Sequence, residues 1–446
     1  MSKYRYKLEH YHAIESADIV IDGITVLAGE NGCGKSTLSR WLYYLVNGSR
    51  RYEEYVYKSY IRRVYRMLRR LDMPNREMRL NMSEKEMPNR FYIQSLYKTG
   101  IDEKYDEEDF HKLTYYYKKV VRGFTENLEV YLNKDISENR QKRILNYLGI
   151  DDEGLTKQEV VYRIRDKYDS FLESTIEELN SELETRPVSR LIKTISKDYE
   201  QEEDTPKNIQ LYEDNVGLID GNIISELYNL KKAIYIDTPL ALFHEYDDNL
   251  FWKELNDMVL DYNSDLSLSE KKLLSRIKNI LHGEARFVES DSLFEEEGKL
   301  RYHSVDHNVD ININKTATGF KTFIYLQRLL ENGYLNQESL LLIDEPEVHL
   351  HPQWIVEYAR LLVLLNKELG LKIMLATHNP DMVAALRSIA EYENVLSNTH
   401  FYISERDPES SKYVYKDLGS DIEAIFASFN IALSRIQSYG VGGIQQ

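Results

Sequence analysis

The sequence has almost no cysteine and no long apolar segment, and both absences limit what the protein can be. Its 446 residues include one cysteine, Cys33, so no disulfide can form within the chain, and a reducing compartment is expected. No run of about 18 apolar residues is present, so no membrane-spanning helix is expected. The first residues also lack the apolar core of a signal peptide. We therefore expect a cytoplasmic globular protein.

The chain also lacks an excess of positive charge. Lysine and arginine total 57 against 74 aspartate and glutamate residues, which gives a net charge of −17. A field of this sign does not attract nucleic acid. The exception is the arginine-rich segment Arg50–Arg79, where bases could stack among the charges. The same segment could instead be a solvent-exposed helix face, or could bind an acidic neighbouring subunit. Its interleaved tyrosines are Tyr52, Tyr55, Tyr57, Tyr60 and Tyr65.

A glycine-rich segment near the N-terminus matches the phosphate-loop pattern G-x-x-x-x-G-K-[ST] in full, from Gly29 to Ser36. Residues 24–28 before it predict a buried strand, and residues 37–45 after it predict a helix. In this context the glycines let backbone N–H groups surround phosphate oxygens. We expect Lys35 to bind the β- and γ-phosphates of ATP and Ser36 to be a Mg²⁺ ligand. The other expected nucleotide-binding residues are Gly29, Asn31, Gly32, Cys33, Gly34 and Thr37.

A second candidate segment lies about 300 residues later and ends in two adjacent carboxylates. Residues 340–343 predict a buried strand that leads into Asp344, an expected Mg²⁺ ligand, and Glu345, expected to orient and deprotonate the attacking water. Residues 353–369 predict a helix, and residues 372–377 predict a parallel neighbouring strand that ends at His378. Because such strands end at one sheet edge, His378 should lie near Asp344 and sense the γ-phosphate.

These motifs carry a family resemblance. The strings GENGCGKST, LLLIDEPEVHLHP and ATHNP resemble the Walker A, Walker B and switch-histidine motifs of ABC-type ATPases. They are most similar to the soluble branch that contains OLD-family, RecF and SMC-like heads, and EPEVHLHP distinguishes OLD-like members from transporter subunits. The resemblance covers residues 1–48 and 230–446. It implies an α/β head with a mixed, partly parallel sheet that binds ATP and Mg²⁺.

The family also carries a signature loop that contacts ATP held by a second subunit. The candidate is Lys315–Lys321, although Ala317 stands where the family serine often lies. Thr318 and Gly319 are the contacts that the resemblance implies, while a plain helix N-cap by Thr316 or Thr318 is also compatible with the pattern. The resemblance thus implies a homodimer or higher homo-oligomer joined through ATP.

Three segments are expected along the chain. Residues 1–50 and 230–446 form the two parts of the ATPase head, and residues 51–229 form a largely α-helical insertion, with 157–186 as its clearest helix. The insertion has no sustained heptads, which argues against the long coiled-coil arm of SMC-type proteins. The family's glutamine loop has no obvious position, and Gln94 is the one candidate.

The chain shows no second catalytic cluster, and the segment after His378 is too short for the toprim nuclease domain of many OLD-family proteins. A nuclease effector would then be a separate chain. The pattern resembles the ATPases PtuA of Septu systems, which works with an HNH nuclease, and AriA of PARIS systems, which works with a toprim nuclease. The implied function is an ATP-hydrolysing subunit of a bacterial antiphage defence complex. The alternatives are a RecF- or SMC-like DNA-repair ATPase that binds DNA directly, and a transporter subunit.

Overall fold

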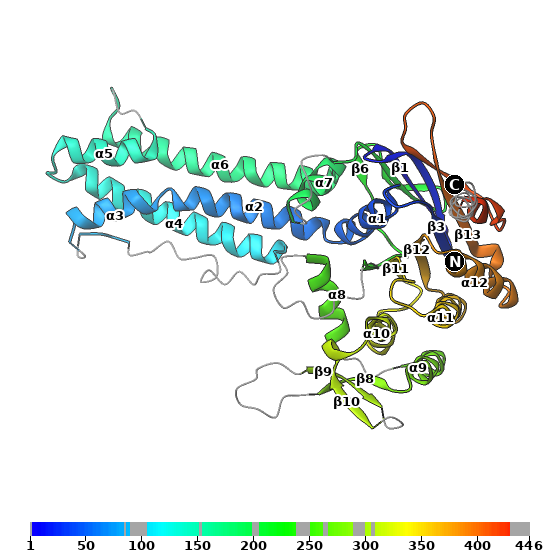
Figure 1. Ribbon diagram of the computed structural model, residues 1–446. Coiled ribbons are helices and arrows are strands. Elements are labelled where there is room, and N and C mark those ends of the chain that lie inside the picture. The colour runs from blue at the N-terminus through cyan, green and yellow to red at the C-terminus, as the bar shows by residue number, and fades with distance from the viewer. Residues whose placement is uncertain are drawn as a thin grey trace, which may run out of the picture. The chain divides into compact units, whose positions relative to one another are not determined.

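The computed structural model describes residues 2–83, 86–89, 105–150, 154–198, 205–237, 250–261, 266–288, 299–304 and 308–428. The chain divides into two compact units (Figure 1). Met1–Arg50 together with Val188–Gln446 forms the first, which we call the head unit. Arg51–Pro187 forms the second, which we call the helical unit.

The head unit is built on a mixed sheet that has 11 strands among the described residues, in the order β6-β5-β4-β1-β2-β14-β13-β3-β12-β11-β7. Strands β13, β3, β12, β11 and β7 run parallel to one another. All residues of β3, β11 and β12 are buried, as expected for strands covered on both faces. The bounds of the parallel strands are β3 Ile24–Ala28, β7 Lys232–Ile236, β11 Ser339–Asp344, β12 Lys372–Thr377 and β13 Thr399–Arg406.

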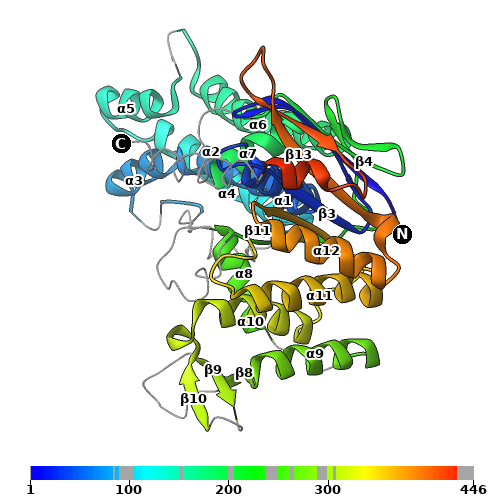
Figure 2. The same ribbon diagram turned by 45° about the vertical axis from the view of Figure 1, so that its right-hand side comes forward.

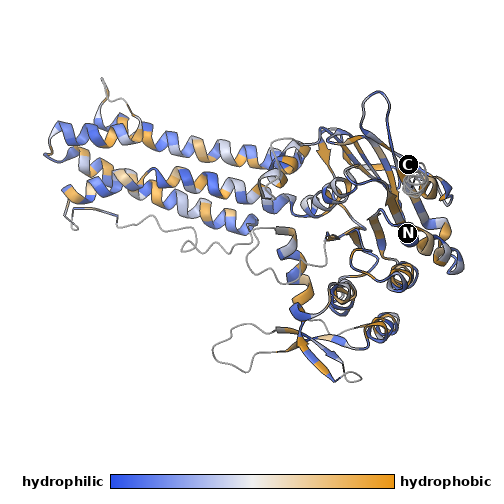
Figure 3. Cartoon of the chain, in the orientation of Figure 1, coloured by the Kyte–Doolittle hydropathy of each residue, from blue (hydrophilic) through white to orange (hydrophobic). Residues whose placement is uncertain are grey.

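Helices cover both faces of this parallel region (Figure 2). α1 lies on one face, against β7, β11 and β12, and α11 and α12 pack together on the other face. This arrangement follows from right-handed crossovers, because β11-α11-β12 and β12-α12-β13 advance across the sheet in the same direction. Apolar residues fill the strands between these layers (Figure 3). The helix bounds are α1 Lys35–Arg50, α11 Pro352–Leu369 and α12 Pro380–Tyr392.

Further elements of the head unit pack next to α11 and β7. Helix α10 packs against α8, α9 and β8, and a small antiparallel sheet has the order β10-β9-β8. The short helix η3 leads from β10 into α10, and η4 precedes β13. Their bounds are α8 Leu250–Leu260, α9 Leu268–Leu281, β8 Glu284–Val288, β9 Lys299–Ser304, β10 Val309–Asn312, η3 Ile313–Lys315, α10 Thr318–Glu331 and η4 Leu396–Asn398.

The remaining part of the large sheet changes the expected domain boundary. β4 pairs antiparallel with β1, so that Tyr4 lies opposite Glu213, and α7 packs on α1 so closely that a Cβ on Gly48 would lie 2.6 Å from Leu191 Cδ1. Residues 188–229 therefore belong to the head, and the expected end of the insertion at residue 229 is wrong. The bounds are β1 Tyr4–Tyr11, β2 Ile14–Ile21, α7 Val188–Asp198, β4 Asn208–Glu213, β5 Val216–Asp220, β6 Ile223–Ile224 and β14 Tyr413–Asp417.

The helical unit is a bundle in which α2, α4 and α6 pack side by side (Figure 1). α6 matches the helix predicted from sequence and begins with a capping box between Thr156 and Glu159. The candidate Gln94 lies outside the described residues. The helix bounds are α2 Tyr52–Arg69, α3 Asp72–Asn81, α4 Glu107–Asn133, α5 Glu138–Leu148 and α6 Lys157–Thr185.

A search of the helices in the described ranges finds none that is both long and apolar enough to cross a membrane.

Candidate nucleotide-binding site

The glycine-rich segment connects β3 to α1, as the sequence predicts. Gly32 and Gly34 have φ angles of +83° and +95°, a conformation that residues with a side chain rarely adopt. A Cβ on Gly34 would lie 2.7 Å from Ile14 Cγ1, and one on Gly29 would lie 1.9 Å from Ser404 Oγ, whereas one on Gly32 would meet open space. The loop is therefore pressed against β2 and β13 from behind and is open on its other side, where a phosphate would bind.

Lys35 lies at the start of α1 and is buried. Its Nζ donates hydrogen bonds to the carbonyl oxygens of Gly29, at 2.9 Å, and Glu30, at 2.8 Å. The side chain thus folds over the loop and is held by neutral acceptors. A phosphate is a stronger partner for an ammonium group than a neutral carbonyl, because charge-assisted hydrogen bonds are the stronger kind. The arrangement suits a cation that exchanges loop carbonyls for phosphate oxygens.

The hairpin of β13 and β14 supports this loop. The Tyr415 hydroxyl donates to the carbonyl oxygen of Cys33 at 3.1 Å, and it lies 3.6 Å from the Cys33 Sγ atom. Cys33 itself is buried. Sequence reasoning did not identify Tyr415, because it follows the loop by several hundred residues and lies outside every motif. The support depends on the pairing of β13 with β3 and of β14 with β13, which no local sequence pattern indicates.

Asp344 ends β11 and is 5% exposed. Ser39 Oγ donates to its Oδ1 at 2.9 Å, the Tyr235 hydroxyl donates to its Oδ2 at 2.8 Å, and the Ser36 hydroxyl also hydrogen bonds to it. Burial raises the pKa of Asp344, although these three hydroxyl donors partly oppose the rise. The structure thus brings together the two predicted Mg²⁺ ligands, Ser36 and Asp344, which come from opposite ends of the sequence.

The oxygen donors at Asp344 fit a magnesium ion, which prefers carboxylate, hydroxyl, water and phosphate oxygens. Within the described ranges, no group of three histidine, cysteine, aspartate or glutamate side chains could hold a metal by itself. Ser36 and Asp344 are the residues that would hold Mg²⁺ here. Ser39 and Tyr235 were missed from the sequence. Ser39 could have been found one helical turn after Ser36, whereas Tyr235 needed the pairing of β7 with β11.

Glu345 and His378 lie next to each other beyond the ends of β11 and β12. Glu345 has a φ of +46°, an unusual conformation for a residue with a side chain, and its N–H donates to the Ala376 carbonyl oxygen at 2.8 Å. Its Oε1 lies 3.3 Å from His378 Nδ1, and both side chains are about two-fifths exposed. The parallel pairing of the two strands thus places these residues side by side at the sheet edge, where their predicted roles require them.

Glu347 is a further carboxylate of the site that sequence reasoning did not single out. Its Oε1 accepts hydrogen bonds from Thr377 Oγ1, at 2.7 Å, and from the His378 backbone N–H, at 3.1 Å. The same oxygen lies 3.5 Å from His378 Nδ1. Burial raises the pKa of Glu347, and the hydrogen bond from Thr377 partly opposes the rise. Its place in the EPEVHLHP string was the only available signal.

The signature-loop candidates Thr318 and Gly319 begin α10. The N-cap residue is Ala317, and no side chain caps this helix, so a plain N-cap by Thr316 or Thr318 is not observed. Instead, the Thr316 hydroxyl donates to the Ile313 carbonyl oxygen. A Cβ on Gly319 would lie 2.8 Å from the carbonyl oxygen of His349, so glycine is needed where α10 approaches the turn after β11.

The arginine-rich segment divides into paired and exposed side chains. Arg63 forms an ion pair with Glu178, and Arg69 forms one with Asp72 at 3.0 Å, whereas Arg62 and Arg66 are exposed. Of the interleaved tyrosines, three are buried in the helical unit and cannot stack with bases in this conformation. These are Tyr52, Tyr55 and Tyr60.

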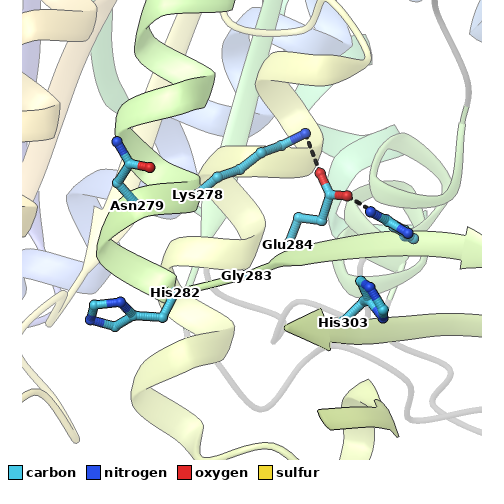
Figure 4. Close-up of a pocket in the computed structure, with 7 residues that line it drawn as sticks. Lys278, Asn279, His282, Gly283, Glu284 and His303 are labelled. Atoms are coloured by element: carbon cyan, nitrogen blue, oxygen red, sulfur yellow. Dashed lines mark hydrogen bonds and ion pairs between the residues drawn. The ribbon is translucent and has the colours of Figure 1, made fainter. Parts of the chain in front are cut away.

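A separate hollow of about 460 Å³ lies where α9 ends and β8 and β9 pair (Figure 4). Glu284 forms ion pairs with both Lys278 and Arg286 at this place, and Lys278 also pairs with Glu331 at 3.2 Å. None of the predicted site residues lines it. The lining residues are Lys278, Asn279, His282, Gly283, Glu284, Arg286 and His303.

Comparisons with solved structures give weak likenesses. An SMC head domain with an extended coiled coil from Pyrococcus furiosus, bound to the C-terminal domain of ScpA, has a TM-score of 0.34 at 11% identity, covering 98% of this chain and 100% of that one. A bacterial ABC transporter cassette solved as a dimer has a TM-score of 0.25 at 14% identity, covering 45% of this chain and 70% of the other.

Comparisons of sequence are more informative. Endonuclease GajA of Bacillus cereus (strain HuB5-5) is 23% identical over 192 residues, which are 37% of this chain and 27% of GajA. The chain thus spans about a quarter of the length of this curated relative. The family model described as an AAA ATPase domain matches residues 5–383, which include the phosphate loop, Asp344, Glu345, Glu347 and His378. With most of its length matched, the chain belongs to this family of AAA ATPase domains.

Proposed function

We propose that the protein binds and hydrolyses ATP at the edge of the head sheet. The observation that carries this proposal is that Lys35, Ser36, Asp344, Glu345 and His378 all lie at or just beyond the carboxyl ends of three neighbouring parallel strands, β3, β12 and β11. These residues come from segments far apart in the sequence, and an α/β sheet binds ligands beyond the carboxyl ends of its strands. Membership in the AAA ATPase domain family supports the same reading.

The roles follow from the surroundings of each group. Lys35 would bind the β- and γ-phosphates, and Ser36 and Asp344 would hold Mg²⁺, which when bound neutralises charge on the phosphates. Glu345 is the half-exposed carboxylate and would accept a proton from the attacking water. His378 lies beside it and would contact the γ-phosphate. Asp344, buried and bonded to three hydroxyls, is unsuited to the base's role.

We also propose that ATP joins two copies of the chain. α10 begins at Thr318 without a side-chain cap, and an uncapped helix N-terminus favours an anion. α10 packs on α8, α9 and β8, whereas the phosphate loop leads into α1. By resemblance to the family's signature loop, Thr318 and Gly319 of one copy would serve the nucleotide of the other, in a homodimer or higher homo-oligomer.

The proposed biological role is regulation of a separate nuclease, of the HNH or toprim type, in an antiphage defence complex like those of PtuA and AriA. The similarity to endonuclease GajA supports a link between this ATPase head and nuclease activity. ATP-dependent assembly would control the partner nuclease.

The test measures ATP turnover and complex mass, with ATP or ADP, for the chain alone and with the products of neighbouring genes. Wild type should hydrolyse ATP, and Glu345→Gln should double its mass with ATP. Thr318→Asp is the variant that tests the assembly. Its carboxylate at the start of α10 should repel the phosphate bound by the other copy, so the variant should bind ATP but keep the mass of one chain. An unchanged mass of Glu345→Gln with ATP would contradict the assembly, and absence of a co-purifying nuclease would contradict the biological role.

Direct DNA binding by a repair ATPase remains the second candidate, because Arg62 and Arg66 on α2 are exposed. The net charge of −17 and the burial of three interleaved tyrosines weigh against it. Charge reversal, Arg62→Glu with Arg66→Glu, distinguishes the two. DNA-stimulated hydrolysis that disappears in this variant would favour the repair ATPase.

A further inference from the structure

Glu347 is a buried acidic group of the site for which the roles proposed above have no use. It lies in the turn between β11 and α11, and its side chain is 4% exposed. Among the described residues, its Oε1 receives two hydrogen bonds while its equally buried Oε2 has no partner. A buried carboxylate with an unpaired oxygen is costly, and such groups are retained mainly where they have a function.

The two carboxylates beside His378 differ in their surroundings. Glu345 Oε1 lies 3.3 Å and Glu347 Oε1 lies 3.5 Å from the same imidazole nitrogen, Nδ1. Glu345 is 41% exposed and is therefore screened by water, whereas the charge of Glu347 acts through a poorly polarisable interior. Glu347 is also fixed by two hydrogen bonds. Of the two carboxylates near the His378 ring, that of Glu347 is thus the more rigidly held and the less screened by water.

An imidazole whose Nδ1–H faces a carboxylate has its Nε2 at the opposite end of the ring. Donation from Nε2 to a phosphate requires that both ring nitrogens carry protons. Glu347 can therefore set the orientation of the ring, with Nδ1 on the carboxylate side.

Glu347 also connects the turn after β11 to the end of β12. Its carboxylate holds Thr377 and the His378 N–H, and its own carbonyl oxygen accepts from the Leu350 N–H at 3.0 Å. In the same turn, the Val348 N–H donates to the carbonyl oxygen of Glu345 at 3.0 Å. The φ of +46° at Glu345 is thus kept by a turn whose side-chain anchor is Glu347.

We propose that Glu347 is a positioning residue for ATP hydrolysis, whose buried carboxylate fixes the His378 ring with Nδ1 on the carboxylate side and Nε2 directed to the γ-phosphate. This inference rests on the proposed ATP hydrolysis. It makes Glu347 act through His378, without contact with the nucleotide.

The variant Glu347→Gln separates charge from shape. An amide oxygen can still accept from Thr377 and from the His378 N–H, so the fold should be kept, while the negative charge is lost. ATP affinity should stay within about twofold, and kcat should fall roughly tenfold, the usual worth of a hydrogen bond to a charged group. The matched control is Glu213→Gln on β4, because Glu213 is also buried and accepts from Tyr4 and Asn229. It should leave kcat unchanged.

A double-mutant cycle with His378→Ala tests whether Glu347 acts through the histidine. If it does, the double variant should be no slower than His378→Ala alone, within about twofold. Effects on kcat that multiply would show a separate role and overturn the proposal. A wild-type kcat in Glu347→Gln would also overturn the proposal. A strongly reduced melting temperature of Glu347→Gln would overturn it too, because it would show that Glu347 has a structural role.

The outcomes also separate this inference from the proposed function. Wild-type protein that binds ATP without turning it over would overturn both, since the inference depends on hydrolysis. Wild-type protein that hydrolyses ATP as fast as Glu347→Gln does would overturn the inference alone.

Discussion

The two halves of the nucleotide site are built in different ways. The phosphate loop is made of consecutive residues, and its shape comes from glycine φ angles and from backbone carbonyls that hold Lys35. The half at β11 and β12 is made of side chains from separate segments, with Asp344 and Glu347 buried and Glu345 and His378 partly exposed. The half proposed to bind ATP is thus determined by consecutive residues, whereas the half proposed to hydrolyse it depends on the packing of segments far apart in the sequence. Variants should separate accordingly into those that change affinity and those that change kcat.

The largest expected effect is on the turnover half. Glu345→Gln removes the proposed base and keeps its shape, so kcat should fall roughly 10³-fold, in the usual range for general bases, with an unchanged ATP dissociation constant. Phosphate release and calorimetry measure the two quantities. Glu391→Gln, an exposed glutamate on α12, is the control and should behave as wild type. Wild-type turnover in Glu345→Gln would remove Glu345 from the proposed mechanism.

The next effect is on the binding half. Lys35→Ala removes a buried cation and its charge-assisted hydrogen bonds to phosphate, so the ATP dissociation constant should rise roughly 100-fold. Calorimetry with the non-hydrolysing Glu345→Gln background avoids turnover during the measurement. Lys7→Ala on β1 is the matched control, with no expected change. Tight ATP binding by Lys35→Ala would place the phosphates elsewhere.

A smaller effect on turnover is expected at the histidine. His378→Ala should lower kcat roughly tenfold and leave ATP affinity within about twofold, because one hydrogen bond to a charged group is lost. The control is His400→Ala on β13. His400 Nε2 lies 2.8 Å from Asp22 Oδ1, outside the site, so that variant should lose stability without losing kcat. A loss of affinity in His378→Ala instead would move His378 to the binding half.

The smallest effect concerns the support behind the phosphate loop. Tyr415→Phe removes the hydroxyl that donates to the Cys33 carbonyl oxygen, so ATP affinity should fall roughly fivefold, the worth of about 1 kcal/mol. Cys33→Ala keeps that carbonyl and should change affinity by less than about twofold. A larger effect of Cys33→Ala than of Tyr415→Phe would show that the thiol, and not the backbone, shapes the loop.

The same contrast explains what could be predicted from the sequence. The phosphate loop was predictable because its motif is continuous, and Asp344, Glu345 and His378 were predictable because parallel strands end at one sheet edge. Tyr235, Tyr415 and Glu347 were not, because their contacts depend on strand order or on a turn with a left-handed residue.

The predicted end of the helical insertion was wrong for a similar reason. Residues 208–224 look unremarkable alone, but they form the edge of the head sheet because β4 pairs with β1, which lies far earlier in the sequence. The tyrosines of α2 suggested a nucleic-acid surface for a different reason. Their spacing suits stacking platforms, but the same spacing is produced by a helix that buries one face.

The position of α1 has a mechanical consequence. This one helix starts at Lys35, in the phosphate loop, and stops at Arg50, where the polypeptide passes into the helical unit. The returning segment of the polypeptide, helix α7, packs against α1 at Gly48, where an added Cβ would lie 2.6 Å from Leu191 Cδ1. Both covalent connections to the helical unit therefore lie at α1 or at the helix packed on it, and α1 begins at Lys35. A shift of α1 within the head unit would therefore move both points at which the polypeptide leaves and re-enters that unit.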